Sequence, residues 1–277
     1  MSKSIGDQPS TNLDEREAQS YLESAIEFAV AAGAVTLPYF RSNLVVDNKG
    51  IEGSFDPVTE ADRAAEALIR QRIADRYPSH GIFGEEHGEK RGSGPTWVID
   101  PIDGTRSFMT GMLHWGVLIA LFDGESPRIG VMYQPFTEEL FVGDNATAEY
   151  RRGSVRRKLK VRACENVSQA VLACTGPDVF VEGQERQSFE RVRRAVRLTR
   201  FGGDCYLYCL LAMGQLDLAV EAGLKPYDIQ ALMPIIRGAG GVVTAWDGSD
   251  PAMGGRILAA GDKRVHDEAR RLLQDHA

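Results

Sequence analysis

The stretch that decides the fold is WVIDPIDGTRSF, residues 97–108. It begins as a short apolar strand, residues 97–99, and then places Asp100 and Asp103 three residues apart around a proline. An aspartate that ends a buried strand lies at the carboxyl edge of a sheet, where α/β proteins bind their ligands. Asp-Gly is also a common turn dipeptide, so the same letters fit an ordinary strand and turn.

The chemistry of the motif favours a metal site beside a phosphate. Pro101 keeps the chain out of a helix, so Asp103 can turn back toward Asp100, with the Ile102 carbonyl facing the same space. Carboxylate and carbonyl oxygens suit Mg²⁺, which also binds waters and substrate phosphates. No His or Cys joins the cluster, which argues against zinc.

The residues after Asp103 favour an anion site. Gly104 lets a phosphate oxygen approach the backbone closely. If a helix or turn begins here, the amides of Gly104 and Thr105 can bind that oxygen.

Four other segments carry acidic side chains of the same kind, and each has an ordinary structural interpretation. Thr59 and Asp62 fit a helix capping box, Gly84-Glu85-Glu86 fits an exposed turn, and Asp228 fits a cap for the helix after Pro226. Taken singly, the structural interpretation is favoured each time. The segments are residues 56–62, residues 84–86, Glu221 and Tyr227-Asp228.

In this order and spacing, however, the segments resemble the inositol monophosphatase superfamily. The resemblance rests on Asp-Pro-Ile-Asp-Gly-Thr, the preceding Gly-Glu-Glu, an upstream Asp-x-Val-Thr-x-x-Asp and a downstream Tyr-Asp before Gly-Ala-Gly-Gly. It covers about residues 15–275. It implies an α/β fold, a layered αβαβα sandwich of the inositol monophosphatase and fructose-1,6-bisphosphatase type. It also implies a homodimer that hydrolyses a small phosphate monoester with Mg²⁺.

The resemblance also implies roles for single residues. A site of this kind would bind two or three Mg²⁺ ions, which favour deprotonation of the attacking water and stabilise the leaving oxygen. The implied metal ligands are Glu85, Asp100, the Ile102 carbonyl, Asp103 and Asp228. The resemblance implies three catalytic residues, Asp62, Thr105 and Glu85. Of these, Asp62 and Thr105 would orient and deprotonate the attacking water. The residues expected at the substrate are Asp103, Gly104, Thr105, Arg106, Asp204 and Glu221, although Arg106 also fits a contact with a surface carboxylate.

Two segments resemble the histidinol-phosphate phosphatase branch of this superfamily, Gly-Gly-Asp-Cys-Tyr at residues 202–206 and Glu-Ala-Gly-Leu-Lys-Pro-Tyr-Asp at residues 221–228. Asp204 and Glu221 would add two carboxylates beside the leaving alcohol. A neutral polyol needs no negative charge there, whereas histidinol carries an ammonium and a titratable imidazole. We therefore expect L-histidinol phosphate, from histidine biosynthesis, as the substrate.

Several alternatives stay open at this point. One is an inositol-1-monophosphatase of broad specificity, and another is a non-catalytic regulatory or binding protein on the same fold. The nucleotide 3′-phosphatase and fructose bisphosphatase branches are also open, although their substrates carry a second phosphate and the sequence shows no dedicated basic pocket for it. Asp204 also fits a cap for the helix that begins at Cys205. Arg237 stands where the family usually has Glu, and an Arg237 that paired with Asp204 would weaken the argument for a cationic substrate.

The composition of the chain limits the binding partners and the cellular compartment that we expect for it. The chain has 277 residues, a net charge of -7 and a pI near 5.4, which argues against a nucleic-acid surface. The Arg-rich residues 151–158 fit a solvated turn and strand edge. No secretory leader or membrane span is visible, and the four cysteines form no Cys-x-x-Cys pair. We expect a cytoplasmic protein with reduced cysteines.

Periodicity predicts alternating helices and strands, divided near residue 160. We expect a disordered tail at 1–12, an α+β lobe with the metal motifs at 13–160 and an α/β lobe with the specificity residues at 161–277. The predicted helices are 13–36, 60–76, 187–198, 204–213, 227–237 and 263–274. The predicted strands are 97–99, 115–122, 129–133, 140–142, 170–174, 216–221, 242–246 and 257–260, with an extended segment at 55–60.

Overall fold

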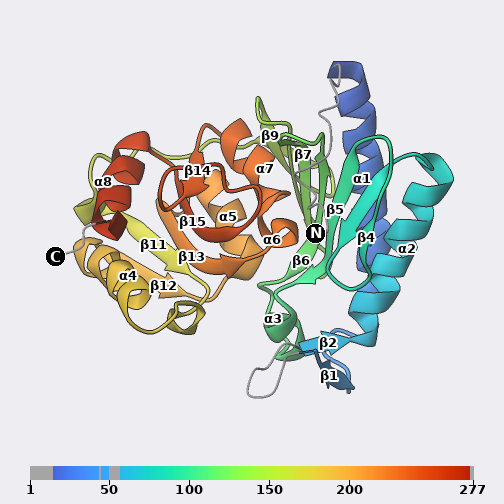
Figure 1. Cartoon of the computed structure of the whole chain (residues 1–277), viewed down its shortest axis with the longest axis horizontal. Helices are drawn as coiled ribbons and strands as arrows, with labels where there is room; N and C mark the ends of the chain where they lie inside the picture. The colour runs from blue at the N-terminus through green and yellow to red at the C-terminus, as the bar shows by residue number, and fades with distance from the viewer. Residues whose placement is uncertain (1–14, 44, 50–56, 275–277) are drawn as a thin grey trace.

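Two large β-sheets alternate with three layers of helices in the computed structural model, which describes residues 15–43, 45–49 and 57–274. Figure 1 shows the layers side by side, with a pair of long helices at one end and the C-terminal helix at the other. The expected αβαβα sandwich is confirmed. The predicted tail at 1–12 and the start of the extended segment, residues 55–56, lie outside the described residues.

The larger sheet has eight strands in the order β10-β9-β8-β7-β6-β5-β3-β4. Its neighbours are antiparallel except β3 and β5, which run parallel with Gly84 opposite Ile99. The chain therefore leaves both strands at the same edge of the sheet, which brings the residues after them together. The bounds are β3 Gly81–Gly84, β4 Gly88–Lys90, β5 Thr96–Asp103, β6 Gly116–Phe122, β7 Pro127–Gln134, β8 Glu139–Gly143, β9 Ala148–Arg152 and β10 Val155–Lys158.

Two helices, α1 (Glu15–Thr36) and α2 (Glu60–Arg76), cover the outer face of this sheet (Figure 1). Their apolar residues form one core with the odd-numbered residues Trp97 and Ile99 of β5. The even-numbered Val98 belongs to a different core on the opposite face. This alternation is the period of two that a strand imposes, and it places Asp100 on the same side of β5 as Val98.

The smaller sheet has five strands in the order β12-β11-β13-β15-β14. Strand β11 runs parallel to both of its neighbours, and β15 runs antiparallel to β13 and β14. Helices α4 (Gln184–Ala195) and α8 (Lys263–Gln274) pack on its outer face through a shared apolar core. The bounds are β11 Val171–Cys174, β12 Leu198–Phe201, β13 Leu218–Leu224, β14 Val242–Ala245 and β15 Gly255–Ala260.

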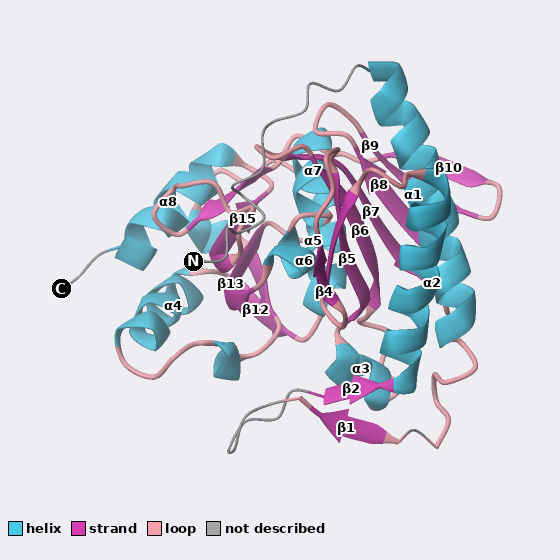
Figure 2. Cartoon of the chain, turned by 45° about the vertical axis from the view of Figure 1, so that its right-hand side comes forward, coloured by secondary structure: helices cyan, strands magenta, loops and turns pink. Residues whose placement is uncertain are grey.

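The middle layer holds three helices between the sheets, α5 (Asp204–Ala212), α6 (Pro226–Ile229) and α7 (Leu232–Gly238) (Figure 2). Their core includes residues from both sheets, such as Leu118 on β6 and Ala259 on β15. The middle layer therefore ties the two sheets into one unit.

Two glycines allow α7 to approach the larger sheet closely. Gly130 on β7 and Gly143 on β8 are register partners. A Cβ on Gly130 would lie 1.9 Å from the Ala231 carbonyl oxygen, and one on Gly143 would lie 2.5 Å from the Pro234 carbonyl oxygen. The backbone just before and inside α7 therefore rests directly on the backbone of the sheet.

The short elements complete the chain. Strands β1 (Val46–Asn48) and β2 (Pro57–Thr59) form a small antiparallel sheet beside α3 (Thr105–Met109). Two single-turn helices, η2 (Val167–Gln169) and η3 (Pro177–Val179), flank β11. The Arg-rich residues form the antiparallel strands β9 and β10 at the sheet edge, as expected.

Most predicted elements are confirmed within a few residues, and the exceptions have physical causes. The helix predicted at 227–237 is wrong as one element, since it divides into α6 and α7 on either side of Gln230 and Ala231. The helix predicted at 187–198 ends at Ala195, and the following residues form the edge strand β12. Strands β1, β3 and β4 were not predicted because they are short and two of them carry polar residues.

The two sheets divide between Lys158, where β10 ends, and Val171, where β11 begins. The helices of the middle layer come from the later part of the chain but pack against both sheets, so the division into lobes at residue 160 stays a prediction. All four cysteines are free and buried. None of the helices among the described residues combines the length and the apolar character that a membrane span requires.

The glycine contact under α7 predicts a stability effect. Gly130→Ala should lower the free energy of unfolding by about 1–3 kcal/mol, because the added methyl cannot fit against the Ala231 carbonyl without moving backbone. Chemical denaturation with urea measures it. The control is Gly176→Ala, where φ is -177° and no atom lies within 4 Å of the added Cβ. Two variants of equal stability would contradict the argument.

Candidate active site

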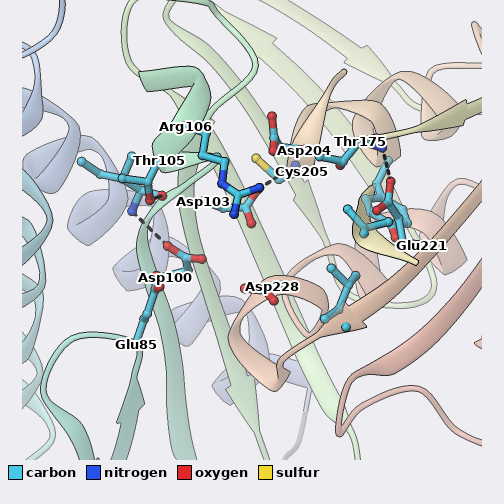
Figure 3. Close-up of a pocket in the computed structure, with 16 residues that line it drawn as sticks. Glu85, Asp100, Asp103, Thr105, Arg106, Thr175, Asp204, Cys205, Glu221 and Asp228 are labelled. Atoms are coloured by element: carbon cyan, nitrogen blue, oxygen red, sulfur yellow. Dashed lines mark hydrogen bonds between the residues drawn. The ribbon is translucent and has the colours of Figure 1, made fainter. Parts of the chain in front are cut away.

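A cavity of about 310 Å³ opens where the ends of β5, α5, α6 and β13 meet (Figure 3). Its size suits a small metabolite. The cavity brings together every predicted site residue except Asp62. Its lining residues are Glu85, Asp100, Ile102, Asp103, Gly104, Thr105, Arg106, Thr175, Val179, Asp204, Cys205, Tyr208, Glu221, Gly223, Leu224 and Asp228.

Asp100 reaches the cavity because of its position on β5. Two residues earlier, Val98 faces the middle layer, so the strand period turns Asp100 to the same side. The Asp100 side chain is buried, with the residue only 2% exposed, and its Oδ1 accepts the Ile102 N–H at 3.0 Å. The carboxylate therefore holds the backbone of the bend that follows it.

A bulge after Asp100 changes the direction of the next side chains. The pairing register with β6 shifts between Asp100 and Asp103, and the Ile102 side chain enters a separate apolar cluster with Phe108 and Trp115. Asp103 then faces the cavity, where its Oδ2 accepts the Cys205 N–H at 2.7 Å. Bulges re-aim side chains in this way beside active sites.

Gly104 makes the turn from β5 into α3. Its φ is 85°, a left-handed conformation, and a Cβ there would lie 2.5 Å from the His114 carbonyl oxygen. The Thr105 hydroxyl donates to the Ile102 carbonyl at 3.1 Å. Since amides in the first turn of a helix lack partners inside the helix, this turn can bind an anion, as the sequence predicts.

Glu85 follows β3 and lies beside Asp100 because β3 and β5 are parallel. Its N–H donates to the Ile99 carbonyl at 3.2 Å. The buried Glu66 carboxylate accepts the N–H groups of Glu86 at 2.7 Å and His87 at 3.1 Å. The buried Glu66 side chain therefore holds the backbone of the turn at residues 84–86, which is not an exposed turn.

Lys49 balances part of the negative charge at this turn. Its Nζ lies 3.1 Å from Glu85 Oε1 and 2.6 Å from Glu86 Oε1. Burial nevertheless raises the pKa of Glu85 to about 7, against the opposing effect of the Lys49 ammonium.

Asp228 completes a cluster of three carboxylates. Its Oδ2 accepts the Lys225 N–H at 2.6 Å, so it caps α6, and it also lines the cavity. Ligand oxygens of Asp100, Asp103 and Asp228 all lie within 4.8 Å of one another. Burial and the neighbouring carboxylates raise the pKa values of Asp100 and Asp103 well above the usual range.

The cluster fits a hard divalent cation. Buried like charges are costly unless a cation compensates them. The donor set is all oxygen, including the Ile102 carbonyl in the same cavity lining, and Mg²⁺ prefers such ligands.

Asp62 lies outside the cavity lining. Its Oδ2 accepts both the Thr59 N–H at 2.8 Å and the Thr59 hydroxyl at 2.5 Å, so the capping box at the start of α2 is confirmed. Its Oδ1 is buried and has no hydrogen-bond partner among the described residues. The catalytic role of Asp62 stays a prediction.

Asp204 is the first residue of α5, with φ at 42°. Its Oδ2 accepts the Ser107 hydroxyl at 2.8 Å, and the Cys205 N–H goes to Asp103 instead. The Asp204 side chain makes no capping hydrogen bond to α5, so the interpretation of Asp204 as a helix cap is wrong. Burial raises the pKa of Asp204, and Ser107, His114 and Arg106 oppose this.

Glu221 lies on β13 across the cavity from Glu85 and Asp100 (Figure 3). The Thr175 N–H donates to its Oε1, and its Oε2 has no partner among the described residues. Burial raises the pKa of Glu221 to about 8. Arg237 does not enter the cavity lining, and its guanidinium lies 3.5 Å from Asp250.

Six residues of the lining are not among the singly predicted site residues, although four of them lie in the stretches 201–208 and 220–229, where the sequence places substrate specificity. One signal could have found Tyr208, which stands four residues after Asp204 and so on the same face of a predicted helix. Thr175 and Val179 follow β11 and reach the cavity only through the parallel pairing of β11 with β13, which the sequence does not reveal. The six are Thr175, Val179, Cys205, Tyr208, Gly223 and Leu224.

The carboxylate cluster predicts a metal-dependent stability. Mg²⁺ should raise the melting temperature of the wild type by several degrees, since a ligand at 100 times its Kd adds about 2.7 kcal/mol. Asp100→Asn should keep the metal-free stability, because it removes a crowded charge, but lose this rise. Thermal unfolding with Mg²⁺ and with EDTA measures both. Asp250→Asn, outside the cavity, is the control and should respond to Mg²⁺ like the wild type.

The raised pKa of Glu221 predicts a pH effect on the metal-free protein. Between the ordinary value of 4.5 and about 8, the folded chain keeps a proton that the unfolded chain releases. The free energy of unfolding therefore falls as pH rises through this window. Glu221→Gln should gain stability relative to wild type between pH 5 and pH 9. Urea unfolding in EDTA measures it, and a constant difference would contradict the prediction.

Comparisons with known proteins agree with this geometry. Residues 17–277 match the model of the inositol monophosphatase family. The chain is 37% identical to the bifunctional phosphatase IMPL2 of Arabidopsis thaliana, over 98% of this chain and 80% of that one. It is 36% identical to a histidinol-phosphatase of Chlorobaculum parvum, over 88% and 93%.

A solved structure of an inositol monophosphatase from Zymomonas mobilis superimposes with a TM-score of 0.82 at 36% identity, covering 93% of this chain and 98% of that one. The chain therefore belongs to the inositol monophosphatase family, whose members are metal-dependent and typically use Mg²⁺, and it is a phosphatase.

Proposed function

We propose that this phosphatase hydrolyses L-histidinol phosphate to L-histidinol and phosphate, a step of histidine biosynthesis. The observation that carries the proposal is the pair of carboxyl groups, Asp204 and Glu221, in the same cavity as the metal cluster. The similarity to a protein named histidinol-phosphatase supports the same substrate.

The proposed metal ligands are Glu85, Asp100, Asp103, Asp228 and the Ile102 carbonyl, holding two or three Mg²⁺ ions. Bound magnesium supplies positive charge that favours deprotonation of water and stabilises the phosphate oxygens. The amides of Gly104 and Thr105, at the first turn of α3, hold the phosphate, and Arg106 lies beside them on the same helix.

Asp62 and Thr105 are proposed to orient and deprotonate the attacking water. Thr59 donates two hydrogen bonds to Oδ2 of Asp62. The other oxygen of Asp62, the buried Oδ1, is therefore available to accept a hydrogen bond from the water. Glu85 supports the same step from the turn that follows β3, the strand parallel to β5. A base within hydrogen-bond reach of its water contributes typically about 10²–10⁴-fold to such a reaction.

The charge of the cavity favours a cationic leaving alcohol. Glu221 is 1% exposed, so its ionised form needs a compensating partner. Among the described cavity-lining residues, Arg106 is the only Lys or Arg side chain. An ammonium on the substrate would make charge-assisted hydrogen bonds to Asp204 or Glu221. Because Arg237 is beside Asp250, it does not oppose such a substrate.

A second candidate is a broad inositol-1-monophosphatase, which the likeness to the Zymomonas mobilis structure favours. Its substrate would be a neutral polyol, for which the two carboxyl groups would act as hydrogen-bond partners only.

We also propose a homodimer, on the resemblance to the family alone, and a cytoplasmic location, on the four free buried cysteines.

The test is phosphate release from L-histidinol phosphate, inositol 1-phosphate, 3′-phosphoadenosine 5′-phosphate and fructose 1,6-bisphosphate, with and without Mg²⁺. We expect the highest kcat/KM on L-histidinol phosphate and no turnover without the metal. A preference for inositol 1-phosphate would establish the second candidate. No hydrolysis of any of the four would indicate a non-catalytic binding protein.

The matched control within this test is Asp204→Asn, which keeps the shape and the acceptor for Ser107 but removes the charge. A lost charge-assisted hydrogen bond should raise KM for L-histidinol phosphate at least tenfold. The KM for inositol 1-phosphate should change less than threefold. Equal effects on both substrates would mean that Asp204 is structural.

A further inference from the structure

Two buried polar atoms at one side of the cavity lack partners. The Tyr208 hydroxyl and Glu221 Oε2 have no hydrogen-bond partner among the described residues, and both residues line the cavity. Tyr208 is 3% exposed and Glu221 is 1% exposed. Native proteins leave few buried polar atoms unpaired, and those they leave call for an explanation.

The fold holds both groups firmly in place. Glu221 is fixed through its other oxygen, which accepts the Thr175 N–H. Tyr208 packs into the core of the middle layer, so its ring has little freedom. Burial, and next the Glu221 carboxyl, raise the pKa of Tyr208 well above its usual range. The Tyr208 hydroxyl therefore keeps its proton and is available as a donor near Glu221.

The neighbouring tyrosine on the same helix behaves differently. The hydroxyl of Tyr206 donates to Glu139 Oε2 at 2.5 Å, and the hydroxyl of Tyr150 donates to Glu139 Oε1 at 3.0 Å. Tyr206 does not line the cavity. These two tyrosine hydroxyls away from the cavity therefore have a carboxylate partner, whereas the Tyr208 hydroxyl and Glu221 Oε2, on two residues that line the cavity, do not.

The order of groups along the cavity matches the proposed substrate. A Cβ on Gly104 would lie 3.1 Å from the Asp204 Cβ, so Asp204 is next to the proposed phosphate site. In the view of Figure 3, Asp204 lies between Thr105 and Glu221. In L-histidinol phosphate the ammonium stands two carbons from the ester oxygen, and the imidazole is more remote. Asp204 therefore suits the ammonium, and the farther pair suits the ring.

We propose that Tyr208 and Glu221 together bind the imidazole of the leaving alcohol and determine specificity for it. The Tyr208 hydroxyl donates to the unprotonated ring nitrogen. Glu221 Oε2 accepts the N–H of the other nitrogen in the ionised form of the carboxyl group, which that N–H favours by supplying the partner that Oε2 lacks. A neutral imidazole offers one donor and one acceptor, which matches the two open atoms. The assignment rests on the proposed function.

The experiment compares Tyr208→Phe with the matched variant Tyr206→Phe on two substrates. They are L-histidinol phosphate and L-phenylalaninol phosphate, which has the same amino alcohol but no ring nitrogen. L-Phenylalaninol phosphate is measured as a substrate or, if turnover is slow, as a competitive inhibitor. Tyr208→Phe should lower kcat/KM for L-histidinol phosphate about three- to tenfold, mainly through KM. The same variant should change kcat/KM for L-phenylalaninol phosphate less than twofold. Tyr206→Phe should not change the ratio of kcat/KM between the two substrates.

The outcomes separate this inference from the proposed function. If the wild type does not prefer L-histidinol phosphate in the four-substrate test, the proposed function is wrong, and the inference that rests on it is wrong as well. A wild type with that preference but an unchanged ratio in Tyr208→Phe overturns the inference alone. Glu221→Gln is the second variant, since it removes the open carboxylate oxygen, and it should lower the same ratio. Hydrolysis or binding of L-phenylalaninol phosphate shows that each variant is folded.

Discussion

The constraint on which the rest of the structure depends is the crowding of three carboxylates, with oxygens within 4.8 Å of one another. Each is held by a backbone amide at the start of a bend or helix, Asp100 by Ile102, Asp103 by Cys205 and Asp228 by Lys225. The fold therefore places repelling groups together through the same bonds that shape its backbone. A cation that relieves this repulsion stabilises the folded chain, so metal binding and folding are thermodynamically linked.

Structural and functional interpretations of these residues turn out to be compatible. Asp228 caps α6 and also faces the cavity, and Asp103 anchors the start of α5 while belonging to the cluster. Each carboxylate has two oxygens, so one can serve the backbone while the other stays available to a ligand. Glu221 shows the same division, with Oε1 on Thr175 and Oε2 open.

The helices, most of the strands and the central motif follow from local signals in the sequence, whereas the layered sandwich and most of the site residues were expected only from the resemblance to the family. Asp100, Asp103 and Gly104 stand within one short motif, and the helices α2 and α8 begin and end where periodicity and capping place them. The parts that it does not predict depend on contacts between distant segments. Strand β12 exists because it pairs with β11. Thr175 reaches the cavity only through the order of strands in the smaller sheet, and the partner of Asp204 proved to be Ser107, 97 residues away.

The glycine pair under α7 has a consequence for the cavity. Gly130 and Gly143 set how near the middle layer lies to the larger sheet, and α6, which carries Asp228, directly precedes α7. Asp100 belongs to the sheet and Asp228 to the layer above it, so the distance between these two ligands is a distance between layers. The close backbone contact under α7 therefore contributes to the spacing of two proposed ligands of the metal site, although neither glycine belongs to that site.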